Sequence, residues 1–195
     1  MPSLPISRNE AIELLKNYNT HSADIIHYLE TEAVMRELAK FLGEDEEYWG
    51  MLGLLHDIDW GITKEDVKTH LTKAGDILRN AGFDERFIKI IISHGYGSKE
   101  LPHLEQNKRS EKVEFALACS ETVTGLIHAY ALMRGKKISD MSVSGLVKKF
   151  KDKTIAAKVE REIILECKNI GIPLEKFLEI AINGIKKIKE RVGLS

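Results

Sequence analysis

The chain has 195 residues, enough for one domain with a substantial buried core. Hydrophobic residues make up 43% of it and charged residues 30%, which is typical of a globular protein in water. The formal net charge of −1 excludes the broad positive surface that polyanions require. We therefore expect no nucleic-acid partner, although a local basic pocket for one phosphate remains compatible with this balance.

Signals for export or membrane insertion are not recognisable in the sequence. The first ten residues, MPSLPISRNE, have no apolar run behind a basic start, so no signal peptide is predicted. The longest apolar runs, near residues 51–55 and 87–92, are too short to cross a bilayer. Cys119 and Cys167 are isolated and form neither a disulfide framework nor a zinc-binding spacing. These features predict a cytoplasmic protein with reduced thiols and no membrane partner.

Helical periodicity begins near the N-terminus. Ser7 and Glu10 form a capping-box pattern that opens a helix through residue 18. Apolar residues at three- and four-residue steps then predict a long helix over residues 22–42. Gly43 follows directly and is expected to close that helix.

Further helices are predicted along the rest of the chain. They cover approximately residues 45–57, 63–81, 84–94, 110–133, 143–150, 155–169 and 174–192. Gly50 and Gly53 in the first of these would let a neighbouring helix approach closely. Residues 95–108 contain glycines and a proline and are expected to form a loop. Since no alternating strand pattern persists, we predict an all-α fold, with a core unit at 1–135 and a C-terminal helical lobe at 136–195 packed on the same domain.

The strongest local chemical signal is the adjacent pair His56 and Asp57 at the end of a buried apolar helix. An ionised carboxylate in such a place needs a cation or strong hydrogen-bond donors, because burying an unpaired charge is costly. The imidazole supplies a nitrogen ligand, and the carboxylate supplies a hard oxygen that can bridge two ions. The pair alone is weak support for a metal site, because such dipeptides also arise by chance.

Four other side chains able to bind a metal lie on separate predicted helices: His27, His70, His94 and Glu121. His27 follows an apolar pair in the long helix, where a histidine on the helix face is the ordinary interpretation. Glu121 lies in an apolar helix, where a solvated carboxylate is not expected. Helices packed as a bundle can direct such groups at one central point.

The segments around these residues resemble the HD superfamily of metal-dependent phosphohydrolases, whose signature is a distant His, a His-Asp pair and a later Asp. The resemblance involves His27 in IIHYLETEAVMRELAK, His56 and Asp57 in GLLHDIDWG, and the segment ALACSETVTGLIHA. It extends over nearly the whole chain, including the tail LVKKFKDKTIAAKVEREIILECKNIGIPLEKFLEIAI. It implies an HD-domain helical bundle with a C-terminal helical extension. His70 and His94 are similar to positions that bind a second metal in dinuclear members.

Two positions depart from the family pattern. Glu121 stands where the family has Asp, and its extra methylene moves the carboxylate oxygens unless the backbone adjusts. The lysine that some dinuclear relatives carry after the His-Asp pair is missing, because this chain reads Ile58-Asp59-Trp60-Gly61. The second departure argues against the cyclic-dinucleotide phosphodiesterase branch.

The resemblance implies a cofactor of one or two divalent ions, which could be manganese, magnesium, cobalt, nickel, zinc or iron. The expected ligands are His27, His56, Asp57, His70, His94 and Glu121. With two ions, Asp57 would bridge them; His27, His56 and Glu121 would hold one, and His70 and His94 the other. Such an ion lowers the pKa of its bound water, which can then attack phosphorus.

Two further residues are expected near the metals. Lys73, one turn beyond His70, is the candidate for binding the phosphate oxygens, with Asp57 as the other catalytic candidate. A solvated surface lysine is the more ordinary role for Lys73. Asp59 is expected either to orient a ligating histidine or to cap the following turn.

The leading functional hypothesis is metal-dependent hydrolysis of a phosphomonoester or phosphodiester, on a nucleotide or another small metabolite. A di-iron oxygenase that uses the same ligands is an alternative from another reaction class. A non-catalytic nucleotide-sensing module is a third. A homodimer that packs through the aliphatic stripe of the last helix also stays open.

Overall fold

A computed structural model of the chain describes residues 3–195, and the regular structure in that range is entirely helical. The helices are α1 (Arg8–Tyr18), α2 (Ser22–Leu42), α3 (Glu46–Leu55), α4 (Trp60–Thr63), α5 (Ala74–Asn80), α6 (Glu85–Ser93), α7 (Lys112–Met133), α8 (Val143–Lys151), α9 (Arg161–Leu165) and α10 (Leu174–Lys187). Short 3-10 turns are η1 (Val67–Thr69), η2 (Pro102–Leu104), η3 (Glu166–Ile170) and η4 (Lys189–Val192). The predicted all-α fold is confirmed. Residues 1 and 2, which begin the predicted core unit, lie outside the described range.

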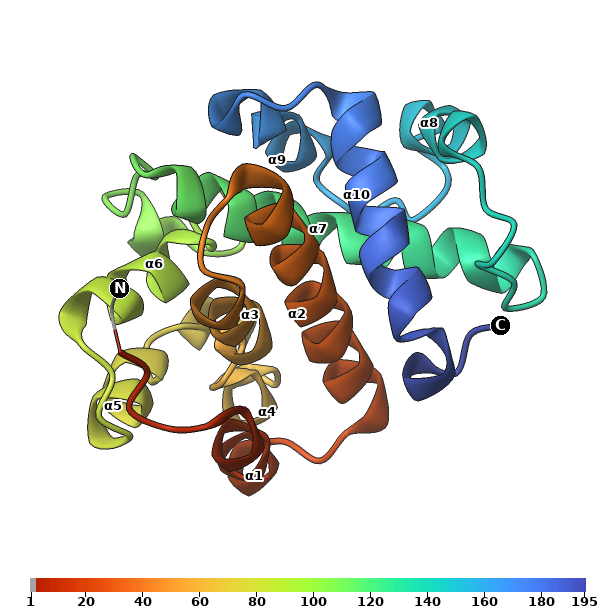
Figure 1. The fold of residues 1–195 in the computed structure, drawn as a ribbon. Coiled ribbons are helices and arrows are strands. Elements are labelled where there is room, and N and C mark those ends of the chain that lie inside the picture. The colour runs from red at the N-terminus through yellow and green to blue at the C-terminus, as the bar shows by residue number, and fades with distance from the viewer. Residues whose placement is uncertain (1–2) are drawn as a thin grey trace.

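Helix α2 is central and packs against α3, α7 and α10 (Figure 1). Glycines make two of these contacts close. A Cβ atom on Gly53 of α3 would lie 2.8 Å from the carbonyl oxygen of Thr31 in α2. A Cβ atom on Gly184 of α10 would lie 2.8 Å from the carbonyl oxygen of Ala33, also in α2. The close approach expected at Gly53 is therefore confirmed.

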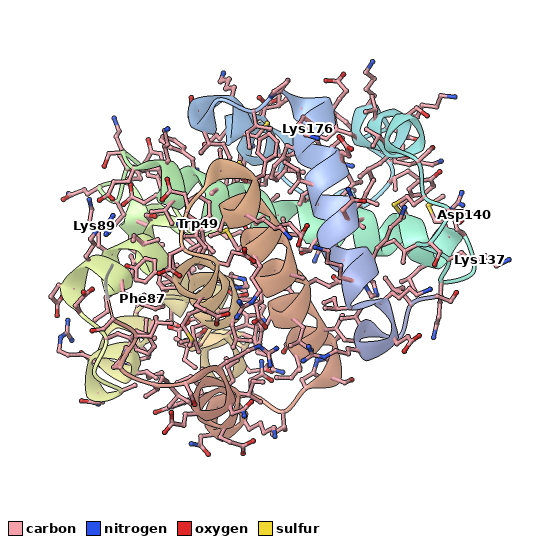
Figure 2. The ribbon with its side chains drawn as sticks, viewed as in Figure 1. Trp49, Phe87, Lys89, Lys137, Asp140 and Lys176 are labelled. Carbon is pink, nitrogen blue, oxygen red and sulfur yellow. The ribbon has the colours of Figure 1, made fainter. Side chains whose placement is uncertain are left out.

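One contiguous hydrophobic core includes residues from Ala11 in α1 to Leu194 near the C-terminus. In Figure 2, Trp49 and Phe87 lie among the packed helices α3 and α6, whereas Lys137 lies at the periphery near the end of α7. Helices α8, α9 and α10 pack on α7, and α10 also packs on α2. The aliphatic stripe of α10 thus faces this chain's own core, while the domain boundary at residue 135 and the homodimer stay predictions.

Helix α7 is long and apolar enough to cross a membrane, judged by length and composition alone. Its most apolar 18-residue window has a mean hydropathy of 1.2, and 61% of that window is buried in the fold. In Figure 1 it passes behind α2 and α10. Because buried core helices satisfy the same criterion, its composition is weak support for a membrane-spanning role.

The predicted start of α1 and the predicted end of α2 are both confirmed. Ser7 and Glu10 form both hydrogen bonds of the predicted capping box at the start of α1. Gly43 closes α2 with a φ of 73°. The loop predicted over residues 95–108 is also present, and it contains only the short turn η2.

The single helix predicted over residues 63–81 is wrong. Within that range, only its last part forms an α-helix of more than one turn, which is α5. Leu71 has a φ of 67°, which interrupts helical hydrogen bonding. The cause is the buried carboxylate of Asp59, which accepts the backbone N–H groups of Leu71, Lys73 and Ala74 at 3.2, 3.0 and 3.2 Å. A distant side chain thus replaces the helical carbonyl acceptors.

The helix predicted over residues 155–169 is also wrong in its first part. Residues 152–160 form turns, and α9 begins only at Arg161. The guanidinium of Arg161 donates hydrogen bonds to the carbonyl oxygens of Ala156 and Val159 at 2.6 and 2.8 Å. Because these carbonyls bond a side chain instead of the backbone, the segment stays irregular.

Candidate metal centre

Four histidines from separate segments surround Asp57. His27 projects from α2, while His56 and His94 end α3 and α6. His70 follows the turn η1, and Asp57 comes directly after α3. They form a first triad (His27, His56 and Asp57) and a second triad (Asp57, His70 and His94), each with its ligand atoms within 4.8 Å of one another. Five of the six ligands predicted from the sequence are thus brought together.

Each oxygen of the Asp57 carboxylate faces the two histidines of a different triad. Oδ2 lies 3.4 Å from His56 Nε2 and 3.8 Å from His27 Nε2. Oδ1 lies 3.1 Å from His70 Nε2 and 3.3 Å from His94 Nε2. This placement fits a carboxylate that bridges two cations.

Backbone carbonyls fix the orientation of two of the imidazoles. His56 Nδ1 lies 2.9 Å from the carbonyl oxygen of Gly53, and His94 Nδ1 lies 2.6 Å from that of Ile91. A carbonyl oxygen only accepts hydrogen bonds, so we assign the ring proton to Nδ1 in both residues. The Nε2 atoms of both rings then face Asp57.

Side chains orient the other two imidazoles in the same way. His70 Nδ1 donates to the carboxylate of Asp59 at 3.0 Å. Asp59 therefore orients a histidine, one of the two roles expected for it. The other role is wrong, because its side chain makes no capping hydrogen bond at the following helix α4. His27 Nδ1 lies 2.9 Å from Thr124 Oγ1, and that hydroxyl donates its proton to the carbonyl oxygen of Glu121 at 2.7 Å. Thr124 thus accepts from His27, whose Nε2 keeps its lone pair.

This donor set fits divalent metal ions. The Nε2 atoms of four imidazoles converge on one carboxylate, and these nitrogens can bind a metal ion once they are unprotonated. The Nε2 atoms of His27 and His56 are only 3.1 Å apart, which requires a shared cation or proton. Imidazole nitrogens combined with carboxylate oxygens are ligands typical of zinc, iron, manganese and related ions. Each triad could therefore hold one such ion.

Burial and neighbouring charges determine the ionisation of the metal-free site. Burial, together with the neighbouring His56, lowers the pKa of His27 to about 4. Burial also disfavours a charged His70, but the carboxylates of Asp57 and Asp59 outweigh it and raise the pKa of His70 to about 10. Burial would raise the pKa of Asp57, yet His56 and His70 hold it well below its usual range. Asp57 is consequently ionised at neutral pH, and protonated His70 is its positive partner until a metal ion binds.

Glu121 lines the same cleft from α7 but belongs to neither triad. Its Oε1 atom lies 2.5 Å from Thr122 Oγ1. Burial raises the pKa of the Glu121 carboxyl, against the opposing effect of His94 and His56. Ligation by Glu121, in place of the Asp of the family, stays a prediction.

The expected position of Lys73 is not borne out. Its side chain is exposed and does not line the cleft, and only its backbone N–H reaches the Asp59 carboxylate. The lysines that do line the cleft are Lys64 and Lys158. Neither was identified from the sequence, because no motif marks Lys64 and Lys158 lies far along the chain from every histidine of the triads.

Arg109 links the second triad to the C-terminal lobe. Its Nη1 atom donates to the carbonyl oxygens of Ser93, His94 and Tyr96 at 2.8, 3.2 and 2.9 Å. The same guanidinium binds both carboxylate oxygens of Glu166 at 2.7 and 2.8 Å. The two paired residues are 57 positions apart, so no local pattern could have revealed the contact.

The triad residues other than the fully buried His56 line a cleft of about 700 Å³. Trp60 and Lys64 line one part of its wall, the loop containing Gly95 and Leu101 another, and the turn at residues 158–160 a third. The C-terminal lobe therefore contributes directly to the space in which a ligand would lie.

Comparison with known proteins agrees with this architecture. A scan against models of protein families matches the HD domain over residues 24–122, just over half of the chain. This range includes all six ligands predicted from the sequence, and the chain belongs to the HD-domain family. No curated protein and no solved structure matches the chain.

Proposed function

We propose that the protein is a metal-dependent phosphohydrolase that acts on a phosphomonoester or phosphodiester of a nucleotide or another small metabolite. The observation that supports this most directly is the pair of triads sharing Asp57 within an open cleft. Membership of the HD family, whose members are usually hydrolases, supports the same class of activity.

Divalent ions in the triads would lower the pKa of bound water, so that hydroxide is available as the nucleophile. They would also supply positive charge for the phosphate oxygens. The chain itself determines where this chemistry takes place. Asp57 stays ionised between the triads, and the outward hydrogen bonds of the histidines keep their Nε2 atoms directed inward. Lys64 and Lys158 on the cleft wall are available to neutralise the remaining phosphate charge.

The test is phosphate release by the purified protein loaded separately with manganese, magnesium, cobalt, nickel, zinc or iron. A panel of phosphomonoesters and phosphodiesters is assayed against metal-free protein and Asp57→Asn, which keeps the size of the side chain. We expect release with at least one ion and its loss in the variant. If the metal-loaded protein releases no phosphate from any ester, the proposal is wrong. Two bound irons with a mixed-valence signal would then favour the oxygenase.

A further inference from the structure

The rim of the cleft is not the basic surface that a polyphosphate would require. It carries Lys64 and Lys158, but also Glu100 and Glu160. Lys64 Nζ lies 3.7 Å from the carboxylate of Asp24, so part of its charge is already compensated. A second or third phosphate of a ligand would therefore meet the repulsive charges of Glu100 and Glu160 without the divalent ions that a phosphate at the triads would have.

Glu160 places a partly buried carboxylate on this rim. Its side chain is half-buried, and although it directly precedes α9 it makes no capping hydrogen bond. Burial raises the pKa of its carboxyl, and the positive charge of Lys99 lowers it by less. Among residues 3–195, Glu160 contributes to no ion pair. A partly desolvated carboxylate of this kind gains from a cationic partner inside the cleft.

Hydrogen bonds from Arg161 hold the turn that carries Lys158 and Glu160. This arginine is only 8% exposed, and its guanidinium donates to the carbonyl oxygens of Ala156 and Val159 and to others earlier in the turn. Because these hydrogen bonds already order the turn, Glu160 can select among ligands without a large ordering cost.

We propose that the substrate is an aminoalkyl phosphomonoester, with its single phosphate at the triads and its ammonium group bound by Glu160. This proposal rests on the phosphohydrolase function and specifies its substrate class. In the reaction, the oxygen of water forms a bond to phosphorus, and the ester bond between phosphorus and the alkoxy oxygen breaks. The proton from water passes to that oxygen, so the products are an amino alcohol and inorganic phosphate.

The test compares esters of similar size that differ in charge. We measure kcat/KM for 2-aminoethyl and 3-aminopropyl phosphate against n-propyl and n-butyl phosphate in the metal-loaded full chain. The native protein is expected to prefer the amines by about ten- to a hundredfold, the size expected of a hydrogen bond to a charged group. Glu160→Gln should bring that ratio close to one. Glu162→Gln, an exposed residue outside the cleft, is the matched control and should keep the native ratio.

The outcomes separate the substrate class from the activity itself. Equal turnover of amine and alkyl esters by the native protein would overturn the amine assignment and leave the phosphohydrolase function intact. A preference for amines that persists in Glu160→Gln would overturn the role of Glu160. Preferred hydrolysis of nucleoside triphosphates would overturn the single-phosphate argument. No hydrolysis of any ester would overturn the phosphohydrolase function, and the substrate class with it.

Discussion

The two triads share Asp57 but are built from different kinds of structure. The histidines of the first triad come from α2 and α3, whose backbones meet closely at Gly53. Those of the second lie after a 3-10 turn and at the end of α6, in segments whose position depends on Asp59 and Arg109. Helix packing therefore positions the first triad, and a network of buried polar groups positions the second.

This difference predicts different vulnerabilities. A triad placed by helix packing should fail when a close backbone contact is forced apart. A triad placed by a polar network should fail when one acceptor is removed, because the donors it served are left buried and unpaired. The two halves of the site can therefore be disturbed separately.

The largest effect is expected from Asp57→Ala, which removes the only residue common to both triads. Both sites should lose metal under conditions that saturate the native protein, since each loses its carboxylate oxygen. Metal content measured by mass spectrometry checks this, with circular dichroism as the control for retained helix. Stoichiometric metal in the folded variant would contradict the shared-carboxylate arrangement.

Asp59→Asn should act on the second triad alone. The amide cannot accept all four hydrogen bonds now made by His70 Nδ1 and the backbone N–H groups of Leu71, Lys73 and Ala74. We expect metal affinity there to fall by about ten- to a hundredfold, the usual effect of losing an orienting carboxylate. Titration calorimetry measures this loss.

Lys73→Ala is the matched control for Asp59→Asn, because the exposed Lys73 side chain belongs to the same turn but does not reach the cleft. It should leave the metal affinities of both triads unchanged. A large loss of metal affinity in Lys73→Ala would show that this lysine contributes to the site.

Gly53→Ala should act on the first triad through packing. The added Cβ would lie 2.8 Å from the Thr31 carbonyl oxygen, so α2 and α3 must separate. We expect the free energy of unfolding to fall by about 1–3 kcal/mol, together with weaker binding at the first triad. Gly75→Ala in α5 is the control, since its Cβ would meet Ile88 at an ordinary 3.5 Å. Equal stability of the two variants in urea would argue against a tight α2–α3 contact.

Metal binding at the second triad should strengthen as pH rises. The pKa of His70 is raised to about 10 in the metal-free protein, so its ring is protonated at pH 8, where an ordinary histidine is neutral. A metal must displace that proton, and affinity should rise by about tenfold per pH unit below this pKa. Calorimetry at pH 8 in buffers of different ionisation enthalpy should detect about one proton released as the second triad fills. No proton release would show that His70 is already neutral.

The smallest effect is expected from Thr124→Val, which removes the acceptor of His27 Nδ1 at nearly constant volume. The first triad should bind metal about five- to tenfold more weakly, in line with the loss of one hydrogen bond. The second triad is the internal control and should be unaffected. Equal losses at both triads would mean that they are not independently positioned.

The sequence alone determined the features that depend on local pattern. Apolar spacing placed α2 at residues 22–42, and the capping box at Ser7 placed the start of α1, because helical hydrogen bonds join residues only four apart. The resemblance to the HD family on His27, His56 and Asp57 identified the residues that form the first triad. It also drew attention to the two histidines of the second.

Only the tertiary structure decided the features that depend on partners far along the chain. The carboxylate of Asp59 unwound the predicted helix around Leu71 and turned Lys73 away from the site. Arg161 likewise kept its neighbouring segment irregular and placed Glu160 over the cleft. In each case a buried charged side chain forms hydrogen bonds with backbone groups that helical periodicity would have paired with each other. Which partner wins depends on burial, because a side chain competes strongly for backbone groups only where packing excludes water from both.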